Sequence, residues 1–100
     1  MLTLRHESGV TLSLAGELDL ASADYLREHV ATLLRAGSSP PHVIIDVAGL
    51  TFVDVAGVRA LADAAARLAE VGGSLRLARA SSQLTRLLRL LGLDTALRAR

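Results

Sequence analysis

The segment LTFVDVAGVRAL, residues 50–61, changes within a few residues from an apolar run to helical spacing. The run stops at Asp54, and the small residues Ala56 and Gly57 follow it. Asp54 stands where a helix N-cap belongs, so its carboxylate is expected to accept hydrogen bonds from the free amides of Ala56 or Gly57. The segment therefore predicts a strand-to-helix junction near the middle of the chain.

The sequence before this junction predicts the central strand of a sheet. Residues 43–47, VIIDV, form an uninterrupted run rich in β-branched side chains, which is typical of a strand covered on both faces. Ala48 and Gly49 are then expected to form a loop. Residues 38–41, SSPP, predict a rigid surface connector, because neither proline can donate to a strand ladder.

The sequence after the junction predicts two helices with a strand between them. The first helix is expected over residues 55–71 and ends at a pair of glycines. Residues 74–78 alternate as a strand does, and a serine at residue 81 or 82 caps a third helix that ends at Gly92. The predicted buried stripe of the first of these helices is Val58, Leu61, Ala62, Ala65 and Leu68.

The start of the chain predicts a β-hairpin. Residues 2–6 and 10–14 both alternate apolar with polar side chains. Residues 16–19, GELD, are expected to form a polar break, and Ser22 to be the N-cap of a helix over residues 23–36. The leucines expected to face inward are Leu2, Leu4, Leu12 and Leu14.

These elements together predict one α/β domain over residues 1–100, a β-hairpin followed by βα units in the order β-β-α-β-α-β-α. A chain of 100 residues can bury one layered core and has no surplus for a second. Residues 93–100 stay unassigned.

Composition argues against nucleic acid as a partner. Hydrophobic residues make up 51% of the chain, charged residues 21% and aromatic residues only 2%, so base-stacking platforms are nearly absent. The net charge is +1, and the arginines are spread along the chain, so no basic stripe could follow a phosphate backbone.

The chain has no cysteine, which excludes disulfides, thiolate nucleophiles and cysteine-based metal sites. No apolar run is long enough to span a bilayer and no signal peptide is recognisable, so we expect a soluble cytoplasmic protein that does not insert into a membrane.

Few residues could serve a catalytic or metal site. His6, His29 and His42 are not spaced to share a metal, and surface histidines are the expected reading. A carboxylate pair of Asp46 and Asp54 is conceivable, but a strand end and a helix cap explain them better. Neither glycine-rich phosphate-binding pattern occurs. We therefore expect no enzyme activity, no cofactor and no metal.

The helix start remains as the candidate site. Ala56 and Gly57 present almost no side chain, so the backbone or a loop of another protein could approach closely. Small residues after an N-cap equally allow the helix to pack on its strand. The residues alone leave both alternatives open.

The motifs GELD (16–19), IIDV (44–47) and LTFVD (50–54), with GVRAL (57–61), resemble the STAS family, which sulphate transporters and anti-sigma-factor antagonists share. The similarity extends from Leu2 to about Leu97. It implies a mixed sheet of four or five strands with helices mainly on one side. It also implies bacterial partner switching in transcription regulation, in which a small STAS protein binds a serine-kinase anti-sigma factor and so releases a sigma factor.

In that family the helix start normally carries two hydroxyl residues, and the second accepts phosphate from the kinase. Aligned on Asp54 and Gly57, the acceptor position is Ala56, and Val55 replaces the other hydroxyl. Three outcomes follow: a permanently competent antagonist, a non-switching scaffold, or a switch at another hydroxyl such as Ser22 or Thr51. The partner-binding residues are expected to be Asp19, Ser22, Asp54, Val55, Ala56, Gly57 and Arg59.

We therefore expect a partner-binding module, monomeric or weakly dimeric, whose partner is an anti-sigma-factor serine kinase. Small STAS proteins also resemble accessory subunits that brace a lipid-transport ATPase and are not phosphorylated. Ala56 suits that alternative too.

Overall fold

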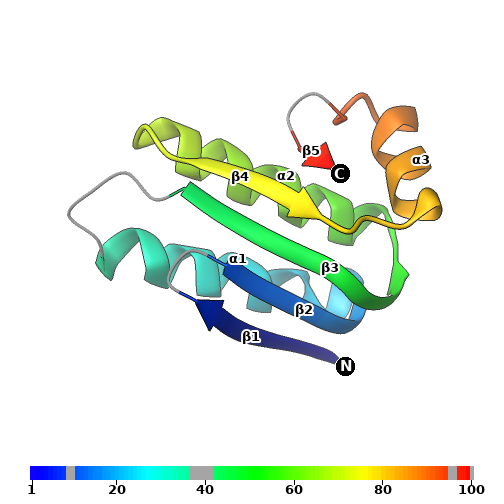
Figure 1. Ribbon diagram of the computed structural model, residues 1–100, viewed down its shortest axis with the longest axis horizontal. Coiled ribbons are helices and arrows are strands. Elements are labelled where there is room, and N and C mark those ends of the chain that lie inside the picture. Colours follow the sequence, from blue (N-terminus) through cyan, green and yellow to red (C-terminus); the bar gives the residue numbers. More distant parts are fainter. Residues whose placement is uncertain (9–10, 37–41, 95–96, 100) are drawn as a thin grey trace.

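The computed structural model describes residues 1–8, 11–36, 42–94 and 97–99. Figure 1 shows two long helices behind a twisted sheet and a shorter helix beside one edge of it. The strands are β1 (Leu2–Ser8), β2 (Thr11–Leu18), β3 (His42–Val53), β4 (Ser74–Ala78) and β5 (Arg98–Ala99). The helices are α1 (Leu20–Ala36), α2 (Val55–Glu70) and α3 (Ser82–Leu90).

The five strands form one mixed sheet in the order β1-β2-β3-β4-β5. β1 pairs with β2 in antiparallel fashion, as the predicted hairpin requires, and the other neighbours are parallel. The hairpin followed by βα units, the mixed sheet and the central place of β3 are therefore confirmed. β5, two residues long, adds a strand in the segment that the sequence left unassigned.

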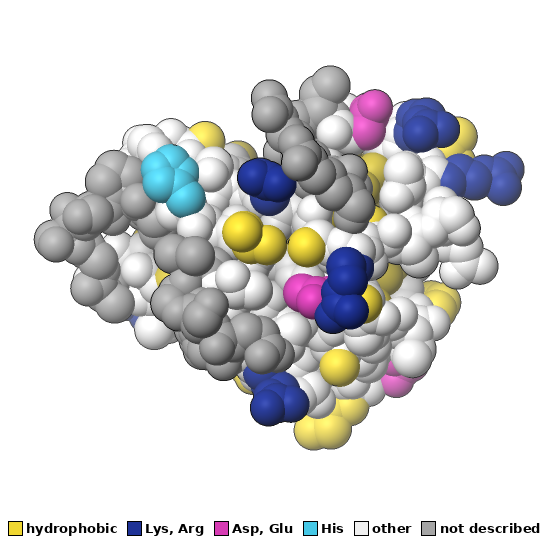
Figure 2. Space-filling model, in the orientation of Figure 1, with side chains coloured by type: hydrophobic (Ala, Val, Ile, Leu, Met, Phe, Trp, Pro, Cys, Tyr) yellow, Lys and Arg dark blue, Asp and Glu magenta, His cyan; other side chains and the backbone are white. Residues whose placement is uncertain are grey.

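The core lies between the sheet and the helices. Val43, Ile45 and Val47 of β3 are buried, whereas Ile44 and Asp46, which point to the opposite face, are only half-buried. The expectation that this strand is covered on both faces is therefore wrong, because α1 and α2 both cover the same face (Figure 1). On the face that Figure 2 shows, the basic side chains of the described residues are scattered.

Several boundaries differ from the predicted ones. Ala48 and Gly49 do not form a loop: β3 continues to Val53, because β2 keeps pairing with it as far as Leu18. Residues 16–19 are likewise not a break, since β2 includes Gly16, where φ is +98° and the register shifts. The strands therefore end several residues later than their polar and glycine residues suggest.

The helices are close to expectation. α2 begins after Asp54 as predicted, and its buried residues are Gly57, Val58, Ala60, Leu61, Ala64, Ala65 and Leu68. Ser81 is the N-cap of α3, and Gly92 after it adopts a positive φ of 71°. Residues 38–41, predicted as a connector, lie outside the described part of the chain. No helix in the described ranges is both long and apolar enough to cross a membrane.

Candidate functional site

The two long helices begin side by side at one edge of the sheet. β2 and β3 are parallel, and their last residues, Leu18 and Val53, are paired in register. A single residue then leads from each strand into a helix, Asp19 into α1 and Asp54 into α2. Both connections are thus as short as a strand-to-helix turn allows, and they place two helix N-termini together (Figure 1).

Asp54 joins the two helix starts through one carboxylate. Its Oδ1 accepts a hydrogen bond from the amide of Gly57 at 2.9 Å, which is the predicted N-cap contact. Its Oδ2 accepts a longer bond from the amide of Leu20 at 3.4 Å, in the first turn of α1. The negative charge of Asp54 interacts favourably with the dipoles of both helices. The contact to Leu20 was not predicted, because the sequence placed the start of α1 three residues too late.

Asp19, not Ser22, is the N-cap of α1. The Oδ1 of Asp19 accepts from the amide of Ser22 at 3.1 Å, and the Oγ of Ser22 accepts from the amide of Asp19 at 3.0 Å. This is the reciprocal arrangement of a capping box with a serine at the third helical position. The Ser22 hydroxyl also donates to the carbonyl of Glu17 at 2.9 Å. Ser22 therefore fixes the turn into α1 from inside the helix.

Gly57 is explained by packing inside the molecule. It is buried, and a Cβ built on it would lie 2.3 Å from the carbonyl oxygen of Leu18 and 2.8 Å from its Cγ. No side chain fits there, so α2 rests directly on the end of β2. Of the two explanations that the sequence left open for Gly57, packing of the helix on its strand is therefore sufficient.

The neighbouring residues face outward. Val55 is 41% exposed, Ala56 is half-buried and Arg59 is exposed one helical turn after Val55. Ala56 is therefore not sealed inside the core. Of the seven predicted site residues, the structure brings Asp19, Ser22, Asp54, Val55, Ala56 and Gly57 to one edge of the sheet, with Arg59 a turn further along α2.

Two apolar residues at the same edge were not among the predicted ones. Leu20, the first residue of α1, is 77% exposed, and Phe52, at the end of β3, is 51% exposed. An apolar residue directly after a cap, and an aromatic residue in a chain with only two, were the signals available in the sequence. Together with Val55 and Ala56 these residues form what we call the tip surface. Clustered apolar exposure of this kind marks interaction sites.

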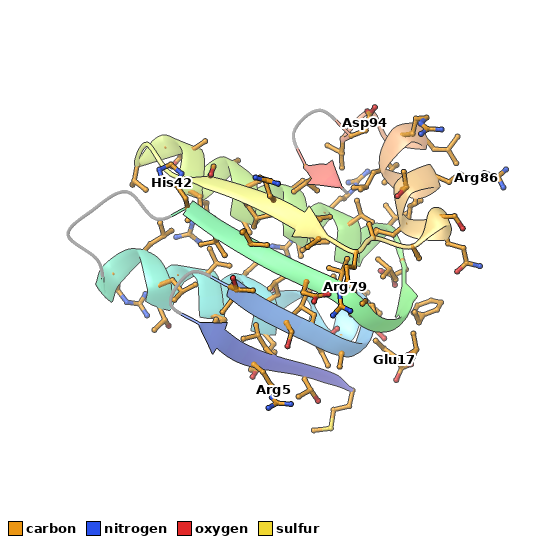
Figure 3. All side chains as sticks on the ribbon, viewed as in Figure 1. Arg5, Glu17, His42, Arg79, Arg86 and Asp94 are labelled. Carbon is orange, nitrogen blue, oxygen red and sulfur yellow. The ribbon has the colours of Figure 1, made fainter. Side chains whose placement is uncertain are left out.

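The carboxylates of Asp46 and Asp54 do not form a pair. Asp46 lies on the open face of the sheet, where Arg79 donates to its Oδ2 and the amide of Ala48 donates to its Oδ1 at 3.0 Å. The Arg79 guanidinium, which Figure 3 shows in front of the sheet, lowers the pKa of Asp46, and the Ala48 amide adds to this effect. The intervening strand advances about 3.3 Å per residue, so the two carboxylates cannot share a proton.

The described histidines are similarly dispersed. The Nδ1 of His42 lies 2.8 Å from the hydroxyl of Ser74, on the neighbouring strand, while His29 is in α1. In the ranges that the structure describes, no three His, Cys, Asp or Glu side chains are grouped closely enough to hold a metal ion.

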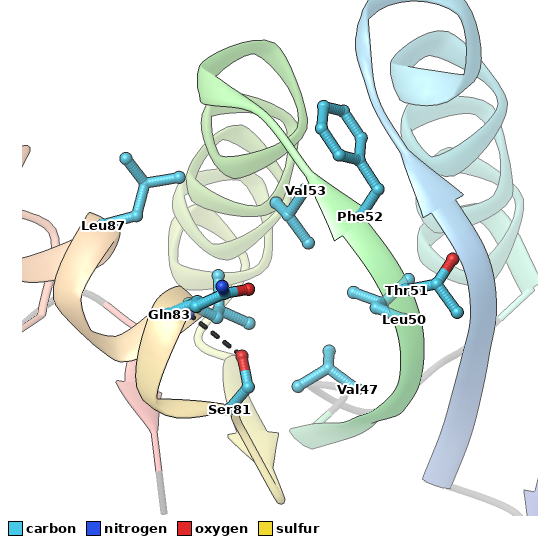
Figure 4. A pocket seen from close by; sticks show the side chains of 9 residues that line it. Val47, Leu50, Thr51, Phe52, Val53, Ser81, Gln83 and Leu87 are labelled. Atoms are coloured by element: carbon cyan, nitrogen blue, oxygen red, sulfur yellow. Dashed lines mark hydrogen bonds between the residues drawn. The ribbon is translucent and has the colours of Figure 1, made fainter.

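A groove adjoins the tip surface on the side of α3. Its lining comes from the last three residues of β3 and from α3, namely Thr51, Phe52, Val53, Gln83, Arg86, Leu87 and Leu90. A narrower hollow continues it along β3 toward Val47 and Ser81. Figure 4 shows Val47 and Val53 of β3 opposite Gln83 and Leu87 of α3.

The chain matches a protein-family model described as "Mlab, STAS domain" over residues 2–99. No curated protein matches it in sequence.

Solved structures show the same fold. An anti-sigma factor antagonist from Mycobacterium paratuberculosis is 24% identical, with a TM-score of 0.77 over 99% of this chain and 83% of that one. The Bacillus cell fate determinant SpoIIAA in its phosphorylated form is 22% identical, with a TM-score of 0.72 over 100% and 91%. The murine anion transporter Slc26a9 is 22% identical, with a TM-score of 0.69 over 90% of this chain and 15% of that one.

Proposed function

We propose, from the premise that this chain belongs to the STAS-domain family, that it is a non-catalytic partner-binding regulator of the anti-sigma-factor-antagonist type. The proposed docking site is the tip surface, with a serine-kinase anti-sigma factor as the partner. The exposed apolar side chains of Leu20, Phe52 and Val55 support it, because a partner would cover them. Asp54 and Asp19 hold the two helix starts rigidly beneath these side chains.

The observation that carries the mode of regulation is Ala56. Its methyl group lies in the first turn of α2 and is half-buried. In the proposed alignment on Asp54 and Gly57, Ala56 takes the place of the family's phosphate acceptor. A phosphate group there would add about 1.5–2 negative charges beside Asp54 and against the partner. Alanine has no oxygen to accept it. The proposed regulator is therefore permanently competent to bind.

Two other hydroxyls near the tip surface differ in accessibility. The Ser22 hydroxyl is hydrogen-bonded to Asp19 and to the carbonyl of Glu17, so phosphorylation of Ser22 would break the cap of α1. Thr51 is exposed and makes one bond, from its Oγ1 to the carbonyl of Gly16 at 3.1 Å. If this regulator has a phosphate switch at either of these hydroxyls, Thr51 is the residue to test first.

The first experiment is to capture the partner from the native cell and measure its affinity for matched variants by calorimetry. Ala56→Asp should weaken binding at least about tenfold while the fold stays intact, because the new carboxylate repels the covering surface. Ala66→Asp, on an exposed position of the same helix, is the control and should bind normally. Equal affinity of Ala56→Asp and the parent protein would refute the placement of the site.

A second experiment tests the kind of partner. Ala56→Ser restores a hydroxyl at the acceptor position and should make the protein a substrate of a kinase partner, seen as incorporated phosphate. A captured partner that binds ATP and the variant but transfers no phosphate would mean that the partner is not a serine kinase.

A second candidate function is an accessory subunit that braces a lipid-transport ATPase, and Ala56 specifically favours it, because such a subunit needs no acceptor. The two functions share the tip surface and differ in the partner. Co-purification with a transporter ATPase in place of a kinase would decide for this second function.

A further inference from the structure

The second half of β3 lacks a strand neighbour on one side. β3 pairs with β2 as far as Val53, but its pairing with β4 ends at Asp46, opposite Ala78. The chain leaves the sheet at Arg79, where φ is +56°, and turns into α3 after Ser81. A space consequently opens between residues 47–53 and α3.

This space is an apolar groove. It holds about 430 Å³ and continues into a deeper hollow of about 60 Å³ along β3. Phe52 on one wall is 51% exposed and Leu90 on the other is 72% exposed, with the half-buried Leu87 between them. Single exposed apolar residues are ordinary on a protein surface, but large ones that line one groove indicate a surface that another molecule covers.

The charge on this groove has one sign. Among the described residues that line it, Arg86 is the only charged one, and its side chain extends from α3 into solvent (Figure 3). α3 carries a second arginine, Arg89, and no acidic residue. Within the described part of the chain no ion pair is formed by either arginine. An acidic group in the groove would therefore meet the Arg86 cation, which no described residue neutralises.

We propose that this groove binds a short segment of a partner protein in which apolar side chains alternate with acidic ones. The apolar side chains cover Phe52, Leu87 and Leu90, and an acidic side chain pairs with Arg86. The proposal rests on the proposed function in one respect: Phe52 belongs to both surfaces, so the same partner occupies the groove and the tip surface.

Other occupants fit these residues less well. A membrane surface needs a broad apolar face, and α3 is a nine-residue helix whose Leu84 and Leu88 are already buried in the core. A small ligand needs several convergent polar groups, whereas this groove offers Thr51, Gln83 and Arg86 on an open rim. An acidic and apolar peptide uses both the leucines and the arginine.

The test uses two synthetic peptides in which leucines alternate with charged residues, glutamates in one peptide and lysines in the other. Each is titrated into the isotope-labelled protein, and backbone amide signals are followed by NMR. The glutamate peptide should shift the signals of residues 51–53 and 83–90, and the lysine peptide should bind at least about tenfold more weakly.

Arg86→Glu is the decisive variant, and Arg89→Glu is its matched control on the same exposed helix surface, outside the groove lining. Arg86→Glu should reverse the preference between the peptides, while Arg89→Glu, with the same change of net charge, should keep it. Equal binding of both peptides, absence of binding, shifts outside the groove, or shifts with anionic lipid vesicles and not with the peptide would each overturn the proposal.

A further variant separates this proposal from the proposed function. Val55→Arg changes the tip surface and no residue of the groove. It should abolish capture of the partner and leave the peptide titration unchanged. Partner capture that survives Val55→Arg contradicts the tip surface alone, whereas a failed titration of the parent protein contradicts the groove alone.

Discussion

The two halves of β3 belong to one strand but have different surroundings. The first half, from His42 to Asp46, pairs with β4 throughout and with β2 from Ile44 on, and Val43 and Ile45 are buried. The second half, to Val53, pairs with β2 alone among the described strands, and Thr51 and Phe52 are exposed. One continuous strand thus supplies the centre of the core and then an open surface.

This difference shows how a small domain can expose apolar side chains without losing its core. The first half is fixed by two neighbouring strands, so the second half can extend past β4 and remain ordered through β2 and the two capped helix starts. If the comparison is right, substitutions in the first half change stability, and those in the second half change binding.

The largest effect should come from the first half. Ile45→Ala removes a fully buried side chain and should lower the free energy of unfolding by about 2–5 kcal/mol. Phe52→Ala, its counterpart in the second half, should cost less than about 1 kcal/mol, because half of the ring is already exposed. Denaturant unfolding of both variants measures the difference. Similar losses of unfolding free energy for the two variants would contradict the difference between the two halves of β3.

The next effect concerns the place where β2 meets α2. Gly57→Ala puts a Cβ against the carbonyl oxygen of Leu18, a backbone atom that cannot turn away, and should cost about 1–3 kcal/mol. Higher helix propensity of alanine would otherwise stabilise α2 by up to about 1 kcal/mol. A stabilised Gly57→Ala protein in thermal unfolding would mean that α2 does not rest on β2 so closely.

The cap of α2 should contribute less. Asp54→Ala removes the acceptor for the amides of Gly57 and Leu20 and should lower the free energy of unfolding by about 0.5–2 kcal/mol. Ser81→Ala, which removes the single cap contact of α3 to Leu84, is the matched comparison and should cost less. Equal losses in denaturant unfolding would show that the contact from Asp54 to Leu20 adds nothing.

The smallest effect should come from the ion pair on the open face. Arg79 lowers the pKa of Asp46 in the folded protein, so the pair stabilises the fold fully above the unfolded pKa of about 4 and loses this contribution as the pH falls through the folded pKa. Asp46→Asn should therefore be less stable than the parent protein at neutral pH by at most about 1 kcal/mol, with the difference vanishing in acid. A difference that persists in acid would exclude the ionic origin.

Local signals predicted most of the fold. The spacing after Asp54, the run at residues 43–47 and the glycine-terminated helices placed the elements in the right order. The errors occurred where tertiary pairing overrode local preference: Gly16 and Gly49 suggest loops, yet both lie in strands, because β2 and β3 continue to pair past them. The register of two distant strands cannot be inferred from either one alone.

The candidate site was predictable only in part. Asp54 was identifiable because an N-cap acts within its own turn, and Gly57 followed from the same motif. The exposure of Leu20 and Phe52 depends on where two helices start relative to one sheet edge, and the groove depends on where β4 stops. These features arise from the relative lengths of separate elements, which no local pattern encodes.

The most direct test of the central claim is amide hydrogen exchange of the protein with and without its captured partner. The account predicts slower exchange in the complex for residues 51–58 and for the start of α1 at Leu20, with the first half of β3 unchanged. Protection that instead covers β1 and the open face of the sheet, and leaves residues 51–58 as they are in the free protein, would contradict it.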